Sequence, residues 1–231
     1  MDNIIAYAKI DIALPQIDDV LLLLNNNWKP HYNTRDYEGG WDVLSLRSPS
    51  GDQDSIYAEL NGHSHFADTP LMGNFPAIKQ LVDTLQCPIH SVRLLNLKAG
   101  AIIHQHRDHE LAFEKGEARL HFPIVTNERV EFFVNDTRVI MLPGQCWYIN
   151  ANLPHRVANH GNTDRIHLVI DCTVNDWLRA VFEASEKTTV AVPIDVVQTL
   201  GVIAQLRLHQ TETSDKLADE LELQLKTHND D

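Results

Sequence analysis

The sequence contains a short motif, His106-Arg107-Asp108, whose residue types and spacing are suited to binding a metal ion. His106 and Asp108 are two residues apart, so on an extended strand both side chains leave the same face. A distant histidine, His155, could add a third ligand from a neighbouring strand. Two histidines and one carboxylate leave coordination positions open, which is the usual setting of non-haem Fe(II) in oxygenases. The sequence therefore predicts an Fe(II) site made by these three side chains.

Arg165 follows His155 by ten residues and falls on the next predicted strand. Its guanidinium group is a planar fork that can pair with a carboxylate through two parallel hydrogen bonds. We expect it to hold the carboxylate of a co-substrate. An isolated His-x-Asp motif occurs by chance in many proteins. The prediction therefore depends on the ordered set: His-x-Asp on one strand, a histidine after Pro154, and an arginine on a later strand.

The composition limits the kinds of partner that fit. The chain has 231 residues, of which 43% are hydrophobic and 22% charged, as in ordinary globular proteins with one sizeable core. A net charge of −13 argues against binding nucleic acid through its phosphates. No apolar run approaches the length of a membrane span, and the N-terminus lacks the features of a secretory signal. Cys87, Cys146 and Cys172 are odd in number and unclustered, which favours reduced thiols and a cytoplasmic location.

Residues 1–89 are predicted to form an N-terminal α/β extension packed on the core. Alternation of apolar and polar residues indicates strands, and apolar residues on one helical face indicate helices. The expected elements are a strand at 4–12, a helix beginning at Pro15, a strand at 41–46 and a helix at 74–85 capped by Asn74.

Residues 90–173 are predicted to be the catalytic core, a jelly roll. Many short strands separated by turn signals are typical of a sandwich or barrel. Asn135-Asp136 suits the tight turn of a hairpin. The expected strands are 91–97, 101–106, 118–125, 130–134, 137–142, 145–149, 155–159 and 165–172.

Residues 174–231 are predicted to form a C-terminal helical region, with apolar stripes at 177–184 and 196–208 and a solvated acidic end after Gln210. The predicted fold is therefore mainly β: a double-stranded β-helix of the jelly-roll, cupin-like kind, with an N-terminal α/β extension and C-terminal helices.

Four segments of the core carry a family resemblance; they are 119–127, 144–150, 155–161 and 165–171. Together they resemble the aspartyl/asparaginyl β-hydroxylase family, a branch of the Fe(II)- and 2-oxoglutarate-dependent oxygenases. The resemblance covers roughly residues 90–173, with a weaker similarity at Gly40-Trp41. It implies a dioxygenase that uses molecular oxygen to hydroxylate an amino acid at an unactivated carbon, with release of succinate and CO2. The substrate would be a free amino acid, as for bacterial members that act on proline, or an Asp/Asn-type residue in a peptide.

The resemblance also implies roles for individual residues. The two histidines of the predicted metal site match the family's iron ligands. Asp108 matches the carboxylate ligand of the bacterial amino-acid hydroxylases, which the animal peptide-hydroxylating members lack. Arg165 matches the arginine that holds the distal carboxylate of 2-oxoglutarate. Arg119 and His121 match a pair that lines the co-substrate and substrate pocket.

Arg93 and Trp41 are candidates for contact with the substrate. An amino acid needs a partner for its carboxylate, and an arginine facing the barrel would provide one. The alternatives are a surface location for Arg93 and a packing role for Trp41. The short chain and the lack of a peptide-recognition module favour a free amino acid over a peptide.

A cupin-type metal site is the main alternative. The protein would then be an isomerase or a metal-dependent binding protein that does not use 2-oxoglutarate. Against this, Gly100 is too close to His104, and Pro154 directly precedes the histidine where cupins have a spacer. Arg165 would also lack a role. A sensor of 2-oxoglutarate without turnover is a third possibility. The cupin ligands would be His104, His106, Glu110 and His155.

Overall fold

The structure is a computed structural model that describes residues 3–15, 17, 28–55, 65–108, 110–191 and 196–229. Its contacts divide the chain into two compact units. The larger unit, residues 5–190, contains the two sheets and helices α1 and α2. The smaller unit, residues 1–4 and 191–231, contains helices α3 (Val196–Leu208) and α4 (Glu212–Asn229), which pack through Ile203, Ala218 and Leu225.

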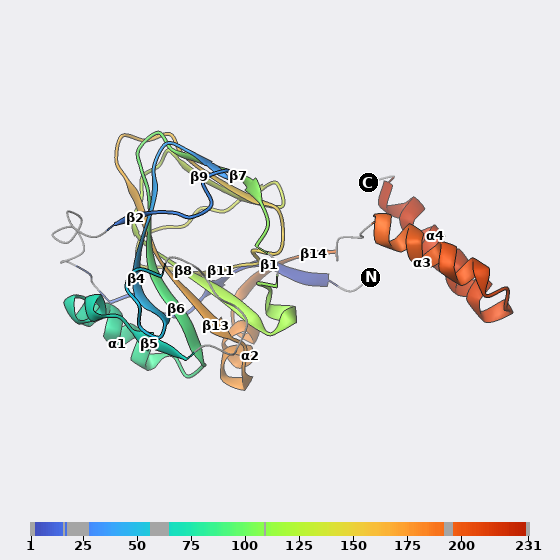
Figure 1. The fold of residues 1–231 in the computed structure, drawn as a ribbon, viewed down its shortest axis with the longest axis horizontal. Coiled ribbons are helices and arrows are strands. Elements are labelled where there is room, and N and C mark those ends of the chain that lie inside the picture. Colours follow the sequence, from blue (N-terminus) through green and yellow to red (C-terminus); the bar gives the residue numbers. More distant parts are fainter. Residues whose placement is uncertain are drawn as a thin grey trace. The chain divides into compact units, whose positions relative to one another are not determined.

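Two sheets form the larger unit (Figure 1). The nine-stranded sheet has the order β14-β1-β11-β8-β13-β6-β4-β2, with β5 paired to β4, and the five-stranded sheet has the order β10-β9-β12-β7-β3. The strands are β1 (Asn3–Ile10), β2 (Lys29–Pro30), β3 (Tyr37–Glu38), β4 (Trp41–Pro49), β5 (Phe66–Asp68), β6 (Ile89–Leu97), β7 (Ile102–His106), β8 (Glu117–Val125), β9 (Val130–Val134), β10 (Thr137–Arg138), β11 (Cys146–Ile149), β12 (His155–Asn159), β13 (Arg165–Thr173) and β14 (Glu186–Ala191).

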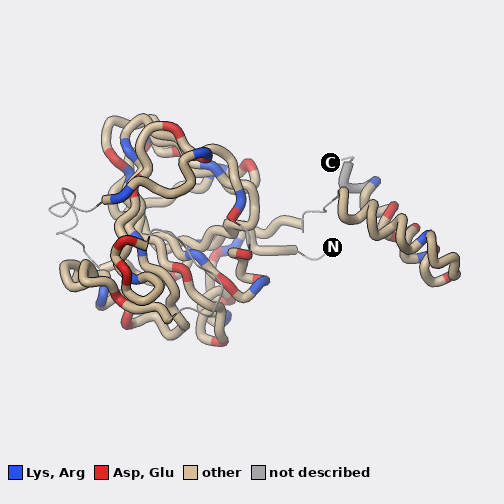
Figure 2. The backbone as a smooth tube through the Cα atoms, viewed as in Figure 1, with Lys and Arg blue, Asp and Glu red and all other residues tan. Residues whose placement is uncertain are grey.

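This arrangement confirms the predicted fold class, which is mainly β and of the jelly-roll kind. Basic and acidic residues lie interspersed along both sheets (Figure 2). No described helix is long and apolar enough to cross a membrane.

Side chains of the nine-stranded sheet alternate between its two faces. On β13 the even-numbered residues from Ile166 to Cys172 belong to the hydrophobic core. The odd-numbered residues from Arg165 to Asp171 must therefore project from the opposite face, toward the second sheet. Strand β8 repeats the pattern, with Leu120 in the core and Arg119 on the opposite face. Period-two alternation thus separates an apolar layer from a polar layer within the same strands.

Helices α1 (Pro76–Thr84) and α2 (Asp176–Glu183) pack on the apolar face of this sheet (Figure 1). Phe182 of α2 is fully buried there. Its ring stacks on Phe113 at a centroid distance of 4.3 Å and meets the edge of Tyr148 at 5.0 Å. Tyr148 in turn accepts a hydrogen bond from the Phe113 N–H at 2.9 Å. This aromatic cluster attaches α2 to the sheet.

The first differences from the sequence predictions concern α1. A 3-10 helix, η1 (Pro70–Asn74), ends where a single helix was expected to begin. Phe75 lies between η1 and α1 with φ −125° and ψ 65°, because a residue before proline is pushed out of the helical region. The predicted cap Asn74 is therefore wrong, since Phe75 occupies the cap position.

Two other differences occur in strands. Within the segment 137–142, only Thr137 and Arg138 (β10) form a strand. The predicted turn before this segment is confirmed, because Asn135 and Asp136 have positive φ values of 44° and 63°. The C-terminal region is also not wholly helical, because β14 lies beside β1 at the edge of the large sheet. The β-branched residues Thr188, Thr189 and Val190 favour that strand.

The N-terminal part contributes directly to the large sheet. Strands β1 and β4 pair with β11 and β6, which belong to the predicted core. The helix expected from Pro15 falls almost wholly outside the described residues. The division into residues 1–89, 90–173 and 174–231 stays a prediction.

Replacing Phe182 with Ala should lower the free energy of unfolding by about 3–5 kcal/mol, because it leaves a cavity in the aromatic cluster. Urea denaturation followed by circular dichroism measures this change. Ile140→Ala, at an exposed position, is the matched control and should change the free energy by less than about 0.5 kcal/mol. Equal effects of the two substitutions would contradict the role of the cluster.

Candidate active site

Two predicted metal ligands, His106 and His155, lie directly opposite each other on β7 and β12. Their ring centroids are 4.2 Å apart. Nδ1 of His106 lies 2.8 Å from the carbonyl oxygen of His104, and Nδ1 of His155 lies 3.0 Å from that of Leu153. Each Nδ1 therefore donates its proton to a backbone carbonyl. This leaves the Nε2 lone pair of each ring available to a metal ion.

Asp108 lies two residues beyond the end of β7, not on the strand as the sequence suggested. Its N–H donates to the carbonyl of Ala151 at 2.8 Å, which fixes the loop. Its Oδ1 is 3.8 Å from Nε2 of His106. One ligand atom from each of Asp108, His106 and His155 lies within 4.8 Å of the others. Two imidazole nitrogens and one carboxylate oxygen in this arrangement fit a divalent metal ion.

The surroundings keep His155 and Asp108 in the protonation states that metal binding requires. Burial, assisted by the neighbouring His106, lowers the pKa of His155 to about 4, so the ring is neutral at neutral pH. Burial alone would raise the pKa of Asp108. The positive charge of Arg119 outweighs that effect, and the pKa of Asp108 is lowered. Asp108 is therefore ionised.

The residues specific to the cupin alternative do not join this cluster. Nε2 of His104 lies 3.2 Å from Glu38, and that histidine side chain is about half exposed. Glu110 pairs with Lys115 at 2.9 Å and is also exposed. The structure therefore assembles the His-x-Asp set with the distant histidine and leaves His104 and Glu110 in surface ion pairs.

Behind the metal ligands lies a buried network centred on Asp171. Its carboxylate accepts hydrogen bonds from Ser91 at 2.7 Å, Arg93 at 2.8 Å and Arg119, whose Nε lies 2.6 Å away. Nη1 of Arg119 also donates to Oδ2 of Asp108. Burial would raise the pKa of Asp171, but the charges of Arg119 and Arg93 outweigh it and hold the pKa far below its usual range. Asp171 is therefore ionised.

The sequence reasoning did not single out Asp171. A signal was available, because Asp171 is a carboxylate inside an apolar strand at an even spacing from Arg165. Residues so spaced share one face of a strand, and an unpaired charge is not buried there without a partner.

Arg165 is buried on the same face of β13. Its Nη2 donates to Nδ1 of His167 at 2.8 Å, and its guanidinium carbon lies 5.7 Å from the ring centre of Phe132. Among the described residues it has no carboxylate partner, and its Nε has no hydrogen-bond partner. Burial lowers its pKa to about 9. A buried cation without a counter-charge is suited to binding an anionic ligand.

His121 lines the same space from β8. Its ring centroid lies 5.9 Å from those of Phe132 and His167. Burial and then the charge of Arg165 lower its pKa well below the ordinary value, so the ring is neutral. Its Nδ1 has no hydrogen-bond partner in the described part of the chain. His121 can therefore exchange a hydrogen bond with a ligand.

Two adjoining cavities bring these groups together. The inner cavity is lined by the three predicted metal ligands together with Arg119, His121 and Arg165. The outer cavity has a volume of about 290 Å³, and its lining includes Arg93 and Tyr32. The two cavities share five lining residues, which are Trp41, Leu95, His106, Asp108 and Arg119. Every predicted site residue therefore lines one cavity or the other.

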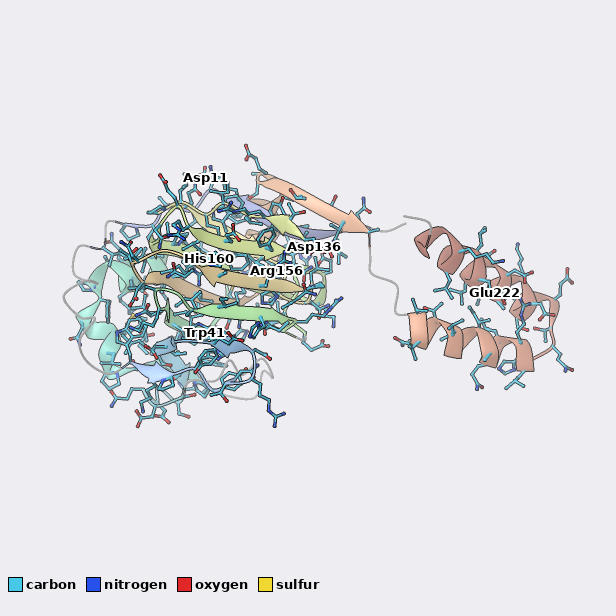
Figure 3. The ribbon with its side chains drawn as sticks, turned by 90° about the horizontal axis from the view of Figure 1, so that it is seen from above. Asp11, Trp41, Asp136, Arg156, His160 and Glu222 are labelled. Atoms are coloured by element: carbon cyan, nitrogen blue, oxygen red, sulfur yellow. The ribbon has the colours of Figure 1, made fainter. Side chains whose placement is uncertain are left out.

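An aromatic pair forms one wall of the outer cavity. The ring of His31 stacks on Trp41 at a centroid distance of 3.6 Å and an interplanar angle of 13°. Burial lowers the pKa of His31 to about 3, so it stays neutral. Trp41, labelled in Figure 3, is the first residue of β4. The sequence reasoning missed His31, which lies outside any periodic segment.

Not every charged residue near the ligands faces the cavities. On β12, Arg156 follows His155 and so projects to the other side of the strand. There it pairs with Asp136 at 2.9 Å, and its guanidinium group lies 4.1 Å from the ring centre of Phe133. Both members of the ion pair are labelled in Figure 3. Arg156 is therefore adjacent to a metal ligand in the sequence, but its side chain lies on the other side of the strand from the cavities.

Comparison with known proteins identifies the family. Residues 16–174 match the family described as aspartyl/asparaginyl beta-hydroxylase, so the chain belongs to that family. It is 30% identical over 135 residues to the L-proline cis-4-hydroxylase of Rhizobium meliloti (strain 1021), which covers 58% of this chain and 48% of that protein. It is 30% identical over 138 residues to the L-proline cis-3-hydroxylase 2 of Streptomyces sp, covering 58% and 47% respectively. The chain thus spans about half of the length of these curated relatives.

Solved structures give more distant similarities. A member of the 2OG-Fe(II) oxygenase family from Burkholderia pseudomallei is 11% identical with a TM-score of 0.42, covering 68% of this chain and 79% of that one. A protein described as a predicted oxalate decarboxylase from Thermotoga maritima is 15% identical with a TM-score of 0.37, covering 64% and 92%.

The buried histidines predict a dependence of stability on pH. The pKa values of His31, His121, His155 and His167 are lowered in the folded protein, whereas unfolded histidine titrates near pH 6.5. The unfolded chain therefore binds more protons below about pH 6.5, and stability falls as the pH decreases from there. Each histidine contributes up to about 1.4 kcal/mol per pH unit. Urea titrations of the metal-free protein from about pH 7.5 to about pH 5 measure the slope. His31→Phe should make it shallower, and an unfolding free energy independent of pH would contradict the prediction.

Proposed function

We propose that the protein is an Fe(II)- and 2-oxoglutarate-dependent dioxygenase that hydroxylates an amino acid. The observation that carries this proposal is the convergence of His106, Asp108 and His155 in a cavity that also contains Arg165, a buried cation with no carboxylate partner among the residues that the structure describes. Membership of the hydroxylase family supports it. The cupin alternative explains less of the site, because it gives Arg165 no role.

When bound, Fe(II) together with 2-oxoglutarate would activate molecular oxygen, which is the oxidant: one oxygen atom would enter an unactivated C–H bond of the substrate and the other would enter succinate, with release of CO2. His106, Asp108 and His155 would hold the metal through single atoms. Arg165 would pair with the distal carboxylate of the co-substrate, in a geometry that its planar fork favours. His167 keeps that fork oriented by accepting a hydrogen bond from it.

Arg119 and His121 would line the co-substrate between the metal and Arg165. Arg119 uses Nε, Nη1 and Nη2 in its contacts with Asp171 and Asp108, yet each Nη carries a second hydrogen that a ligand could accept. Neutral His121 offers its Nδ1, which has no hydrogen-bond partner among the described residues. The ring of Phe132, with the neighbouring apolar residues, would exclude water from this space.

The charge count of the site supports a dicarboxylate co-substrate and a carboxylate-bearing substrate. The charged residues that line the two cavities, together with the buried Asp171, are four arginines and three carboxylates, which leave one positive charge; they are Arg93, Arg107, Arg119, Arg165, Asp36, Asp108 and Asp171. A divalent metal ion raises the surplus to three, and a dicarboxylate reduces it to one. The remaining positive charge could pair with the carboxylate of an amino-acid substrate, whose ammonium group would keep the net charge of the site at one.

We propose that this substrate is a free amino acid bound in the outer cavity. Arg93 lines that cavity, and within the described part of the chain its buried Nε has no hydrogen-bond partner, so it can receive the substrate carboxylate. Trp41 and the stacked His31 would provide a flat wall for the substrate side chain. A volume of about 290 Å³ is at the small end of ligand pockets. A peptide would need an open groove through which the chain enters and leaves.

A substrate screen tests the proposal. Amino acids, and peptides that contain the same residues, are incubated with Fe(II), 2-oxoglutarate and oxygen, and succinate release and a mass gain of one oxygen are measured. We expect coupled turnover with a free amino acid.

Asp108→Ala tests the metal site in the same assay. This variant should reduce turnover by more than about a hundredfold, because it removes the anionic metal ligand. Turnover of peptides alone would contradict the free amino acid, and full activity of Asp108→Ala would contradict the metal site.

Arg165→Lys tests the co-substrate site. Lysine keeps the charge but loses the bidentate fork, so the KM for 2-oxoglutarate should rise about tenfold or more, the effect of roughly 1.4 kcal/mol. The KM for the amino acid should change much less. Arg156→Lys, at the cation on the other side of β12, is the matched control. An unchanged KM for 2-oxoglutarate in Arg165→Lys would remove Arg165 from the co-substrate site.

A further inference from the structure

We propose that Arg119, anchored by Asp171, restricts Asp108 to binding the metal through one oxygen and thereby keeps one coordination position open. The inference rests on the proposed metal site and deepens it. It makes Arg119 and Asp171 positioning residues, in addition to any contact that Arg119 makes with the co-substrate.

The two oxygens of the Asp108 carboxylate have different partners. Oδ1 is the atom near the metal ligands, 3.8 Å from Nε2 of His106. Oδ2 accepts a charge-assisted hydrogen bond from Nη1 of Arg119. To bind a metal through both oxygens, the carboxylate would have to turn and lose this bond. The loss is unfavourable, because it would leave a charged donor unpaired in a buried site.

Arg119 cannot easily follow such a turn, because its other nitrogens are held. Nε and Nη2 pair with Oδ1 and Oδ2 of Asp171 at 2.6 Å and 3.1 Å, so the guanidinium group is gripped by a bidentate ion pair. Asp171 is almost completely buried and is held further by Ser91 and Arg93. The side chain of Arg119 therefore has one favoured placement.

The backbone register makes this anchor rigid. Asp171 lies directly opposite Arg119 on β8 and directly opposite Ser91 on β6. All three strands are central in the nine-stranded sheet. Groups on central, hydrogen-bonded strands are held more exactly than groups on loops. Asp108 itself lies in a loop and is the least constrained of the predicted ligands. Its hydrogen bond from Arg119 fixes it to the rigid sheet.

The consequence concerns the number of positions left for ligands. Three single-atom protein ligands leave three positions on an octahedral metal ion. A two-oxygen Asp108 would leave two, and a chelating keto acid would occupy both. No position would then remain for oxygen. The proposed reaction therefore requires the contact between Arg119 and Asp108, because this contact keeps one coordination position open for oxygen.

The test counts water molecules on Mn(II) bound to the protein, by electron paramagnetic resonance in 17O-enriched water and without any co-substrate. We expect three waters in the wild type and two in Arg119→Gln, in which Asp108 can turn. Added 2-oxoglutarate should displace two waters from each protein, so that one remains in the wild type and none in Arg119→Gln. Arg156→Gln, which removes a cation from the other side of β12, is the matched control and should keep three waters.

Arg119→Gln leaves Asp171 short of a partner, so thermal denaturation must confirm that the variant folds. If it does not, the double variant Arg119→Gln/Asp171→Asn removes one charge of each sign and gives the same expected count of two. Three waters in either folded variant, or two in the wild type, would overturn the proposal while leaving the metal site intact. A wild-type protein that binds no Mn(II) would overturn both the proposal and the proposed function.

Discussion

The candidate active site depends on the burial of matched charges between two sheets. Asp171 sits at the centre, where Arg93, Arg119 and Ser91 donate to one carboxylate that is 1% exposed. Removing one member of such a network leaves an uncompensated buried charge, which is far more costly than the intact network is stabilising. The two arginines are therefore fixed as a unit, in which Arg119 lines both cavities and Arg93 lines the outer one.

The same strands that carry these charges also carry the core. Period-two alternation sends the even-numbered residues of β13 toward α1 and α2 and sends Arg165 and Asp171 toward the second sheet. A one-residue slip in register would bury the charges among Phe and Leu side chains and expose the apolar set. The hydrophobic layer thus enforces the register that the site requires. The cavities lie on the polar face of the sheet, from which Arg119, His121 and Arg165 project.

The second sheet supplies the metal ligands by a different route. His106 and His155 are cross-strand neighbours at one end of this sheet, and backbone carbonyls fix the tautomer of each ring. Asp108 comes from a loop and is held by Ala151 and Arg119. The site is therefore assembled across the space between the sheets, with Arg165 and Asp171 on one side and the two histidines on the other.

The sequence alone determined the strand-rich core, the hairpin turn at Asn135, and the set of chemically capable residues, because local alternation, turn chemistry and residue type are properties of short segments. Family membership could also be anticipated from four short segments. The tertiary structure alone decided which side chains meet. It excluded His104 from the metal cluster by pairing it with Glu38, and it revealed Asp171 as the anchor of Arg119. It also placed His31 against Trp41. These outcomes depend on strand register and on long-range burial of charge, which bring together residues distant in the chain and which no local pattern encodes.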